Sequence, residues 1–540
     1  MSKDFIEPIE PIELQLPTQS GNMSFLTKSE QSSGSNQDDI ILRQLGKRPL
    51  LNRSFGFMSI LGLACSAMCS WEGILVTSVP TFSLGGPAAV VWAFVLGWIG
   101  TISVTATMAE LASVAPTAGG QYHWVAMIAP ESCSAFLTYV TAWLTTLAWQ
   151  AMAITSSYTT STILLGIVVL ANPTYTPLSW HTILTMWATT SFAVLLNLTG
   201  GRVLAKFEGL ILVLHLAGFF GILVPMVYFA PHNPPDFVFT TLFNNGNWPT
   251  QGLSFLVGFP TVATALIGAD CAVHMSEEIQ SAAIVVPRAL MYSIFINGAL
   301  AFAIIVGLMF CISDLDAAVE AANTMFYSFL EIFQSAVKST TGACLMAGII
   351  FILSLASSIS VYASASRMMW SFSRDKGLPL SRYLVRLTKD RLPMNSILST
   401  TAITLVLSLM VLAPSVALSA LLSLVVAALY SSYLLVSCLL LWRRCTGGFK
   451  PYTPGIDIHD SGSPTWGPWK LPEPLGTVNN AFACMYSALL LFWSFWPQTT
   501  NPAPETFNWS VLVFGFVLLS SISWYILKAR HYFKGPIKEV

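Results

Sequence analysis

Charged residues are scarce in this sequence. They make up 9% of its 540 residues, whereas apolar residues make up 54%. Soluble domains carry about 25% charged residues, so this composition excludes an ordinary soluble protein and indicates a chain that crosses a membrane many times. The net charge of −1 gives no indication of nucleic-acid binding. Residues 1–53 lack an early apolar core, so we expect no cleavable signal peptide and a disordered cytoplasmic tail.

Several kinds of chemistry also lack the residues they need. The nine cysteines form no CxxC pair and no dense cluster, so we expect neither a disulfide framework nor a metal site. We interpret them as small apolar packing residues. No nucleophile–base or metal constellation is recognisable, and we therefore expect no enzyme activity and no cofactor.

Long apolar runs are what the sequence does contain. A bilayer is spanned by about 20 apolar residues, and this rule predicts an all-α polytopic membrane protein with twelve transmembrane helices. Their expected limits are 55–79, 87–113, 132–158, 180–199, 207–229, 252–275, 288–312, 342–372, 395–413, 416–443, 478–497 and 507–528.

The basic residues set the expected orientation, because Lys and Arg concentrate in cytoplasmic loops. With the N-terminus placed inside, Lys338 alone of the 25 Lys and Arg residues falls outside. We therefore expect both termini in the cytoplasm. The outer segment 314–339 is amphipathic and predicts a surface helix, and the Pro- and Gly-rich inner loop 444–477 predicts irregular structure.

The first span carries an acid in a stretch of small residues, 64–73, which ends in Glu72 and Gly73. A charged group at mid-membrane depth costs about 2.5–3.5 kcal/mol, so such a residue is a functional-site hypothesis by default. A helix that breaks here would form half of a substrate site. The alternative is that Glu72 lies near the outer interface and reaches into water.

The sixth span is interrupted as well, over residues 258–270, which contain Pro260 and Gly268. Interrupted helices at matching positions of two halves indicate a transporter site, because half-helix ends carry partial charge that can hold an ion or zwitterion. The alternative is a simple Pro260 kink. Asp270 and His274 lie four residues apart on one helix face; they predict either a proton-linked gate or a static pair.

His215 lies about two turns into the fifth span. A histidine there can titrate near neutral pH. The alternative is a neutral histidine bonded to a Ser or Thr of span eight. Aromatic rings can hold quaternary ammonium groups, and six are candidates near the expected site: Trp71, Trp149, Phe255, Phe259, Tyr362 and Tyr430.

Four stretches resemble one known family. Residues 110–124 are similar to the inner-loop signature of the amino acid–polyamine–organocation permeases, and more narrowly to the fungal amino acid/choline branch, which includes GABA and choline permeases. The agreeing stretches are 268–278 with 286–289, 366–379, and 197–215 with 218–220. The resemblance covers about residues 50–530.

This resemblance implies two inverted five-helix repeats plus two trailing helices, which work by alternating access. The implied division is a ten-helix core over 54–443, a loop over 444–477, helices 11 and 12 over 478–528, and a cytoplasmic tail over 529–540. Transferred by position, the substrate-binding residues are Cys69, Ser70, Trp71, Glu72 and Gly73 of an unwound span one, Thr264, Ile267 and Gly268 of span six, and Tyr362 as a covering aromatic. Asp270 falls at a gating position, and His215 falls where relatives carry a lysine in place of a sodium ion.

The sequence departs from that family at Glu72, where related amino acid permeases carry Gly or Ser. A carboxylate there repels substrate carboxylates and favours amines. We therefore expect a secondary active permease for amino acids or related amines such as choline or GABA, with protons as the coupling ion and His215 and Asp270 as coupling or gating residues. A nutrient sensor or a passive facilitator of the same fold is the alternative. The plasma membrane is the expected location, with the vacuolar membrane as the other possibility.

Overall fold

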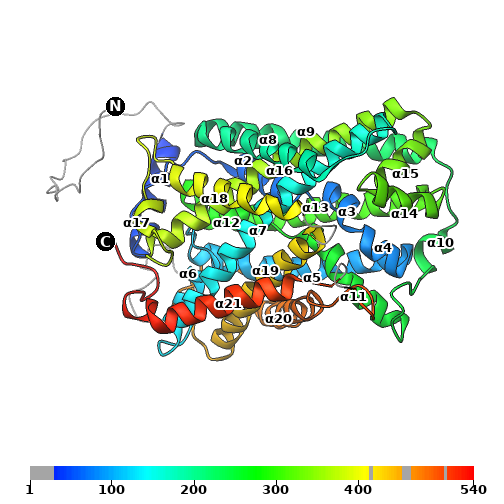
Figure 1. The fold of residues 1–540 in the computed structure, drawn as a ribbon. Coiled ribbons are helices and arrows are strands. Elements are labelled where there is room, and N and C mark those ends of the chain that lie inside the picture. Colours follow the sequence, from blue (N-terminus) through cyan, green and yellow to red (C-terminus); the bar gives the residue numbers. More distant parts are fainter. Residues whose placement is uncertain (1–28, 413–416, 453–463, 504–506, 540) are drawn as a thin grey trace.

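The computed structural model describes residues 29–412, 417–452, 464–503 and 507–539. It is an elongated bundle of helices, and no strand occurs within these ranges. In Figure 1, α1 (Ser29–Gln44), α17 (Ser381–Leu384) and residues 529–539 gather at one end of the bundle. The opposite end carries α10 (Pro235–Thr240), α14 (Leu315–Thr324) and α15 (Ser328–Val337). We call the first end the basic face. Its segments carry Arg43, Arg382, Arg530, Lys534 and Lys538, and Arg48 and Arg374 contact Glu539 there.

Within the described ranges, ten helical segments are long and apolar enough to cross a membrane. In lipid the backbone must satisfy its own hydrogen bonds, so apolar runs of this length form helices. The first segment, Phe57–Gly85, comprises α2 (Phe57–Met68), α3 (Ser70–Thr77) and α4 (Val79–Gly85). The others are α5 (Pro87–Val114), α7 (Ser134–Ala171), α9 (Gly201–Phe229), α13 (Ala282–Cys311), α16 (Thr340–Arg374), α18 with η3 (Met394–Leu407, Ser408–Leu412), α19 (Ala417–Cys445), α20 (Leu475–Trp493) and α21 (Ser510–Leu527).

The other two expected spans are weaker. One is α8 (Ser179–Leu198), which is long enough but contains many polar residues. The other is the interrupted sixth span, formed by α11 (Gln251–Ala263), η1 (Thr264–Leu266) and α12 (Cys271–His274). The all-α polytopic fold is thus confirmed, whereas the count of twelve stays a prediction. The remaining short elements are α6 (Gln121–Ile128), η2 (Ser276–Glu278) and η4 (Ala529–His531).

The prediction of a disordered tail over residues 1–53 is wrong from residue 29 onward; residues 1–28 lie outside the described residues. Residues 29–44 form α1, and Leu42, Leu45 and Leu51 are buried. The carboxylate of Asp38 accepts hydrogen bonds from two backbone N–H groups at the start of α13, those of Ser281 (2.7 Å) and Ala282 (3.1 Å). Burial raises the pKa of Asp38, while these bonds and Arg53 lower it. The segment is ordered because it buries leucines and caps a helix.

The amphipathic segment 314–339 also differs from its prediction. It forms two short helices, α14 and α15, which are separated near Phe326, whose φ is 71°. Phe329, Leu330 and Phe333 of α15 are fully buried. The apolar face of α15 therefore packs against the bundle.

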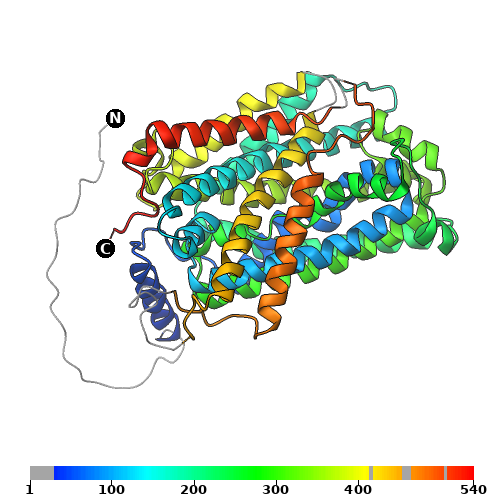
Figure 2. The same ribbon diagram turned by 90° about the horizontal axis from the view of Figure 1, so that it is seen from below.

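The loop over 444–477 is partly regular where it is described; residues 453–463 lie outside the described part. Lys450 and Thr465 form an isolated backbone bridge. The rings of Phe449 and Trp466 stack with centroids 4.2 Å apart. Figure 2, seen from below, shows α20 beside α19 and α21 beside α7, so the last two long helices pack on the outside of the bundle.

Candidate functional site

The first helix break lies at Cys69, between α2 and α3. Cys69 has a left-handed backbone, with φ 46° and ψ 44°. Such a conformation is uncommon outside glycine. The prediction of an unwound segment from Cys69 to Gly73 is wrong in its extent, because Ser70 to Gly73 are already helical in α3. Ser70 N–H, at the start of α3, donates to Asn297 Oδ1 of α13 over 3.4 Å. The break is therefore a sharp kink and not an unwound stretch.

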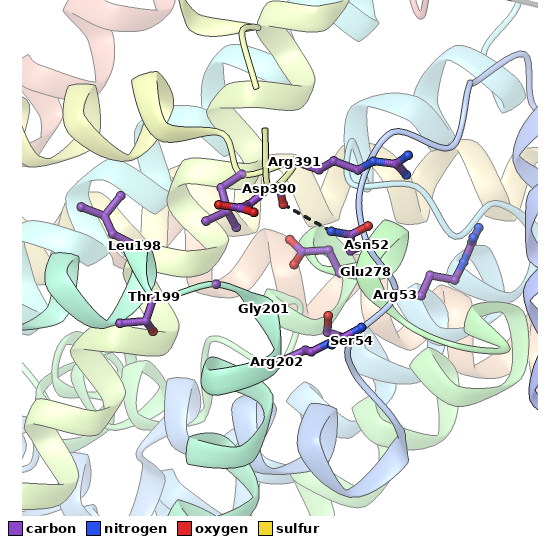
Figure 3. Close-up of a pocket in the computed structure, with 12 residues that line it drawn as sticks. Asn52, Arg53, Ser54, Leu198, Thr199, Gly201, Arg202, Glu278, Asp390 and Arg391 are labelled. Atoms are coloured by element: carbon purple, nitrogen blue, oxygen red, sulfur yellow. Dashed lines mark hydrogen bonds between the residues drawn. The ribbon is translucent and has the colours of Figure 1, made fainter. Parts of the chain in front are cut away.

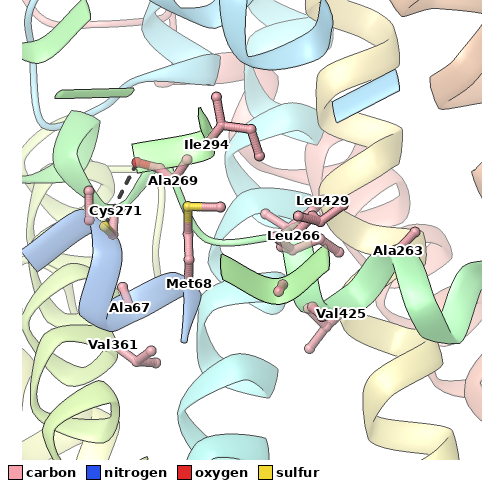
Figure 4. Close-up of a cluster of buried hydrophobic side chains, with 14 of the residues drawn as sticks. Ala67, Met68, Ala263, Leu266, Ala269, Cys271, Ile294, Val361, Val425 and Leu429 are labelled. Atoms are coloured by element: carbon pink, nitrogen blue, oxygen red, sulfur yellow. Dashed lines mark hydrogen bonds between the residues drawn. The ribbon is translucent and has the colours of Figure 1, made fainter. Parts of the chain in front are cut away.

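The second break follows η1, where Ile267 is extended and Gly268 has φ 112°. A Cβ at Gly268 would lie 3.2 Å from the carbonyl oxygen of Ala67. The two breaks therefore touch each other, as the neighbouring Ala67, Met68, Leu266 and Ala269 in Figure 4 show. Glycine is required here for both reasons, its left-handed backbone and the close approach. The structure thus brings the predicted halves of the site together.

Glu72 and His215 form a buried pair at the first break. His215 Nδ1 lies 2.7 Å from Glu72 Oε1, and each side chain is 1% exposed. The ring of Trp71 lies against that of His215, with centroids 5.7 Å apart. The alternative in which His215 bonds to a serine or threonine of span eight is therefore wrong: its hydrogen-bond partner is Glu72. Burial also contradicts the alternative in which Glu72 reaches water at the outer interface.

Polar atoms without a partner surround this pair. They are Glu72 Oε2, His215 Nε2, Ser70 Oγ and Trp71 Nε1. Buried polar groups are nearly always hydrogen-bonded, so unsatisfied ones call for an explanation such as an absent ligand. Four such atoms lie on three neighbouring residues and their histidine partner, which makes this cluster the candidate site for a polar ligand.

Sequence reasoning missed Glu208 of α9, which is fully buried. Its Oε1 accepts a 2.7 Å hydrogen bond from Ser360 of α16, and Ser360 Oγ also lies 3.1 Å from Ser66 Oγ of α2. Glu208 Oε2 has no partner, and no basic residue pairs with Glu208 among the described residues. The sequence signal was available, because Glu208 precedes His215 by two turns and so lies on the same helix face. Glu208, and not His215, faces the serines of span eight.

Asp270 ties span six to the signature stretch 110–124. Gln121 Nε2 donates to Asp270 Oδ2 over 2.7 Å. His274 Nε2 lies 3.9 Å from the same oxygen, while its Nδ1 lies 2.9 Å from the carbonyl of Ala118. The predicted Asp270–His274 pair is therefore present but long. The shorter contact of Asp270 is with Gln121 at the start of α6, and that of His274 is with Ala118 in the segment between α5 and α6.

The hydroxyl of Tyr362 bonds to neighbouring helices, whereas that of Thr264 bonds within its own span. The hydroxyl of Tyr362 lies 3.3 Å from Ser157 Oγ of α7 and 3.3 Å from Thr190 Oγ1 of α8. It therefore points toward these helices, and its predicted covering role gains no support from these bonds. Thr264 Oγ1 donates to Pro260 O over 2.9 Å, which satisfies one carbonyl next to the break.

Two buried ion pairs lie between the breaks and the basic face. Arg367 Nε donates to Glu278 Oε1 over 2.8 Å, and Arg374 Nη1 donates to Glu277 Oε2 over 2.9 Å. Both pairs join α16 to η2. Each of these buried charges is neutralised by a partner, and Arg374 also pairs with Glu539 of the basic face.

A multi-pass helical protein with two interrupted helices that meet inside the bundle has the architecture of a membrane transporter. Comparison with known proteins agrees. Residues 55–517 match the family model for amino acid permeases, and the chain belongs to that family. It is therefore an integral multi-pass permease.

Three relatives illustrate the similarity. The chain is 30% identical to a choline transporter of Saccharomyces cerevisiae, with 73% of this chain and 70% of the relative covered. It is 27% identical to an uncharacterized amino-acid permease of Schizosaccharomyces pombe, with 94% and 90% covered. It is 25% identical to amino-acid permease 2 of Neurospora crassa, with 96% and 92% covered.

Proposed function

We propose that this permease is a secondary active transporter of small amines and amino compounds that carry a cationic group, such as choline or GABA, and that protons drive it. The binding site lies where the two helix breaks touch. The amino acid permease family and the choline transporter among the relatives support a substrate of this class.

The observation that carries the proposal is the carboxylate of Glu72. It is buried beside the break at Cys69, and its Oε2 has no partner. The neighbouring Trp71 is fully buried and has a ring whose face can hold a quaternary ammonium group. A buried carboxylate next to an aromatic ring favours a cationic head and disfavours a substrate carboxylate at the same place.

The contact with His215 links this histidine to the binding of a cation. His215 Nδ1 lies 2.7 Å from Glu72 Oε1, on the carboxylate that a cationic substrate would use. His215 and a cationic substrate would therefore compete for Glu72.

A proton that travels with the substrate needs a different carrier. The sequence-based candidates are His215 and Asp270, and we add Glu208. Its buried position beside Ser360, without a basic partner among the described residues, supports this role, because a buried carboxyl group without a counter-charge exchanges a proton more readily than it stays ionised. Movement of α9 against α2 and α16 would expose it in turn to either side.

The same proposal includes alternating access, cytoplasmic termini and a location in the plasma membrane or the vacuolar membrane. Lys and Arg concentrate on the basic face, which supports a cytoplasmic location for that face. Opening toward the cytoplasm would require the Arg367–Glu278 and Arg374–Glu277 pairs to separate.

Uptake of radiolabelled choline, GABA and neutral amino acids in a permease-deficient yeast strain tests the proposal. We expect concentrative uptake of at least one cationic amine, which stops when an uncoupler is added. Failure to accumulate substrate against a gradient would indicate the passive facilitator. Ligand-dependent signalling without uptake would indicate the nutrient sensor.

A further inference from the structure

A second candidate site lies on the basic face, away from the helix breaks. It is a cavity of about 450 Å³. Its walls come from residues 52–54 before α2, residues 198–202 at the junction of α8 and α9, and residues 390–392 before α18, together with Glu278 (Figure 3). Segments far apart in the sequence therefore surround one hollow.

Two arginines in this cavity lack a counter-charge. Arg53 is already paired with Asp38 and Asp39 of α1. The guanidinium groups of Arg202 and Arg391, by contrast, have no hydrogen-bond or ion-pair partner among the described residues; the hydrogen bond of Arg391 is made by its backbone N–H, which donates to Thr388 O over 2.9 Å. Their guanidinium groups are therefore available to a ligand.

The acids of the cavity do not neutralise these arginines. Glu278 Oε1 accepts from Arg367 Nε over 2.8 Å, so its charge is already compensated. Asp390 is the other acidic wall residue, and the bond found for it is made by its backbone carbonyl, which accepts from Asn52 Nδ2 over 3.3 Å. Two unpaired guanidinium groups against one carboxylate leave the cavity with a net positive charge.

Neutral donors complete the lining. Ser54 contributes a hydroxyl group, and Asn52 contributes an amide that keeps one N–H besides the one it donates to Asp390 O. The hydroxyl of Thr199 already donates to Leu196 O over 2.7 Å. The first turn of α9 also faces this region, and Gly200 gives it no side-chain cap. Arginines together with hydroxyl and amide donors are the groups that recognise phosphate oxygens.

The position of the cavity favours a ligand that reaches it from the membrane. Next to its lining residues, α8 and α9 expose large apolar side chains: Leu195 is 61% exposed and Val203 is 48% exposed. Such side chains on a membrane helix face lipid tails. The cavity therefore lies where the lipid tails give way to the headgroups of the leaflet on the basic face.

We propose that this cavity binds a phosphate-bearing group, and that the group is the headgroup of an anionic lipid. Basic pockets between transmembrane helices on the cytoplasmic side bind such headgroups. The phosphate would contact Arg202 and Arg391 and so join the start of α9 to the loop before α18. The Asn52–Asp390 bond already joins that loop to the segment before α2, and an occupied cavity reinforces this closed arrangement.

Native mass spectrometry of the full-length protein tests this, with phosphatidylinositol 4-phosphate and phosphatidylcholine as probes. We expect the wild type to retain the anionic lipid preferentially. Replacing both arginines, Arg202→Gln with Arg391→Gln, should weaken retention roughly thirtyfold, because each basic residue contributes about one kcal/mol near an anionic surface. The control is Arg382→Gln on α17, which does not line the cavity and should leave retention unchanged.

A further variant, Asp390→Asn, tests the direction of the charge effect. Removing this carboxylate should strengthen retention of the anionic lipid. A soluble arm uses inorganic phosphate and inositol 1,4-bisphosphate as competitors. Arginine-dependent binding of these anions without retention of the lipid would keep the phosphate site but overturn the lipid as its source. Equal retention by the wild type and the double variant, with no arginine-dependent binding of either soluble anion, would overturn the proposal. These readouts are independent of uptake, so they stand or fall separately from the transport proposal.

Discussion

The pairing of Glu72 with His215 predicts strong coupling between the two side chains. We consider three variants: Glu72→Gln, His215→Gln and the double substitution. Each single change removes one member of a pair that is 2.7 Å apart and 1% exposed. His215→Gln leaves Glu72 as a buried carboxylate without its partner, and Glu72→Gln leaves His215 without an acceptor that carries charge.

The magnitude follows from burial. Removing one partner of a buried hydrogen bond leaves the other unsatisfied and costs about 1–3 kcal/mol, and more where the remaining group is charged, whereas replacing both partners costs less. We therefore expect each single variant to lose stability and the double variant to recover most of it. A coupling free energy of about 0.5–3 kcal/mol is the range for contacting residues.

Thermal unfolding of the purified protein in detergent measures this cycle, with ligand absent so that substrate binding does not contribute. The control combines Glu72→Gln with Glu320→Gln. Glu320 belongs to α14, at the opposite end of the bundle from the basic face, so the effects of these two substitutions on stability should add. If the Glu72 and His215 substitutions also add within about 0.5 kcal/mol, the two side chains do not interact, and the reasoning about this pair is refuted.

Three further predictions concern other parts of the molecule. Gly268→Ala should abolish most uptake at normal surface expression, because φ is 112° and a Cβ would lie 3.2 Å from the carbonyl oxygen of Ala67. The control is Gly209→Ala, where a Cβ meets nothing within 4 Å, and uptake should persist. Normal uptake by Gly268→Ala would contradict the contact between the breaks. Glu208→Gln should abolish uptake driven by a pH gradient in proteoliposomes but preserve substrate exchange, and a variant still driven by the gradient would exclude Glu208 as the proton carrier. Burial raises the pKa of Glu539, but hydrogen bonding and charge from Arg374 lower it by more, so the net pKa is depressed. Glu539→Gln should therefore lower thermal stability above about pH 4.3, the ordinary glutamate pKa, and the difference from wild type should shrink as the pH falls below that value. A difference in stability that does not depend on pH would exclude the charge of Glu539 as its cause.

The sequence predicted the breaks better than the contacts between them. Pro260 and Gly268 indicate an interruption because one lacks an N–H donor and the other permits a left-handed backbone. The partner of Glu72 could not be predicted, since His215 lies 143 residues away and the register of α9 against α3 depends on the packing of the whole bundle. One alternative from sequence position bonded His215 to a serine or threonine of span eight, and the structure places Glu208 there, two turns earlier.

The N-terminal segment shows a different reason for failure. Its polar composition predicted disorder, but Leu42, Leu45 and Leu51 are buried and Asp38 binds the start of α13. These leucines are too few to form an apolar run, so composition alone hides them. This segment is ordered because it packs against the rest of the chain, and that surface cannot be predicted from the segment's own sequence.

The measurement that tests the central claim most directly is the KM for radiolabelled choline in wild type and Glu72→Gln, at equal surface expression. Loss of one charged interaction costs about 1.5–3 kcal/mol, so we predict a KM that is roughly tenfold to a hundredfold higher. A neutral amino acid that both proteins transport serves as the control and should change much less. An unchanged choline KM in Glu72→Gln would contradict the account of this site.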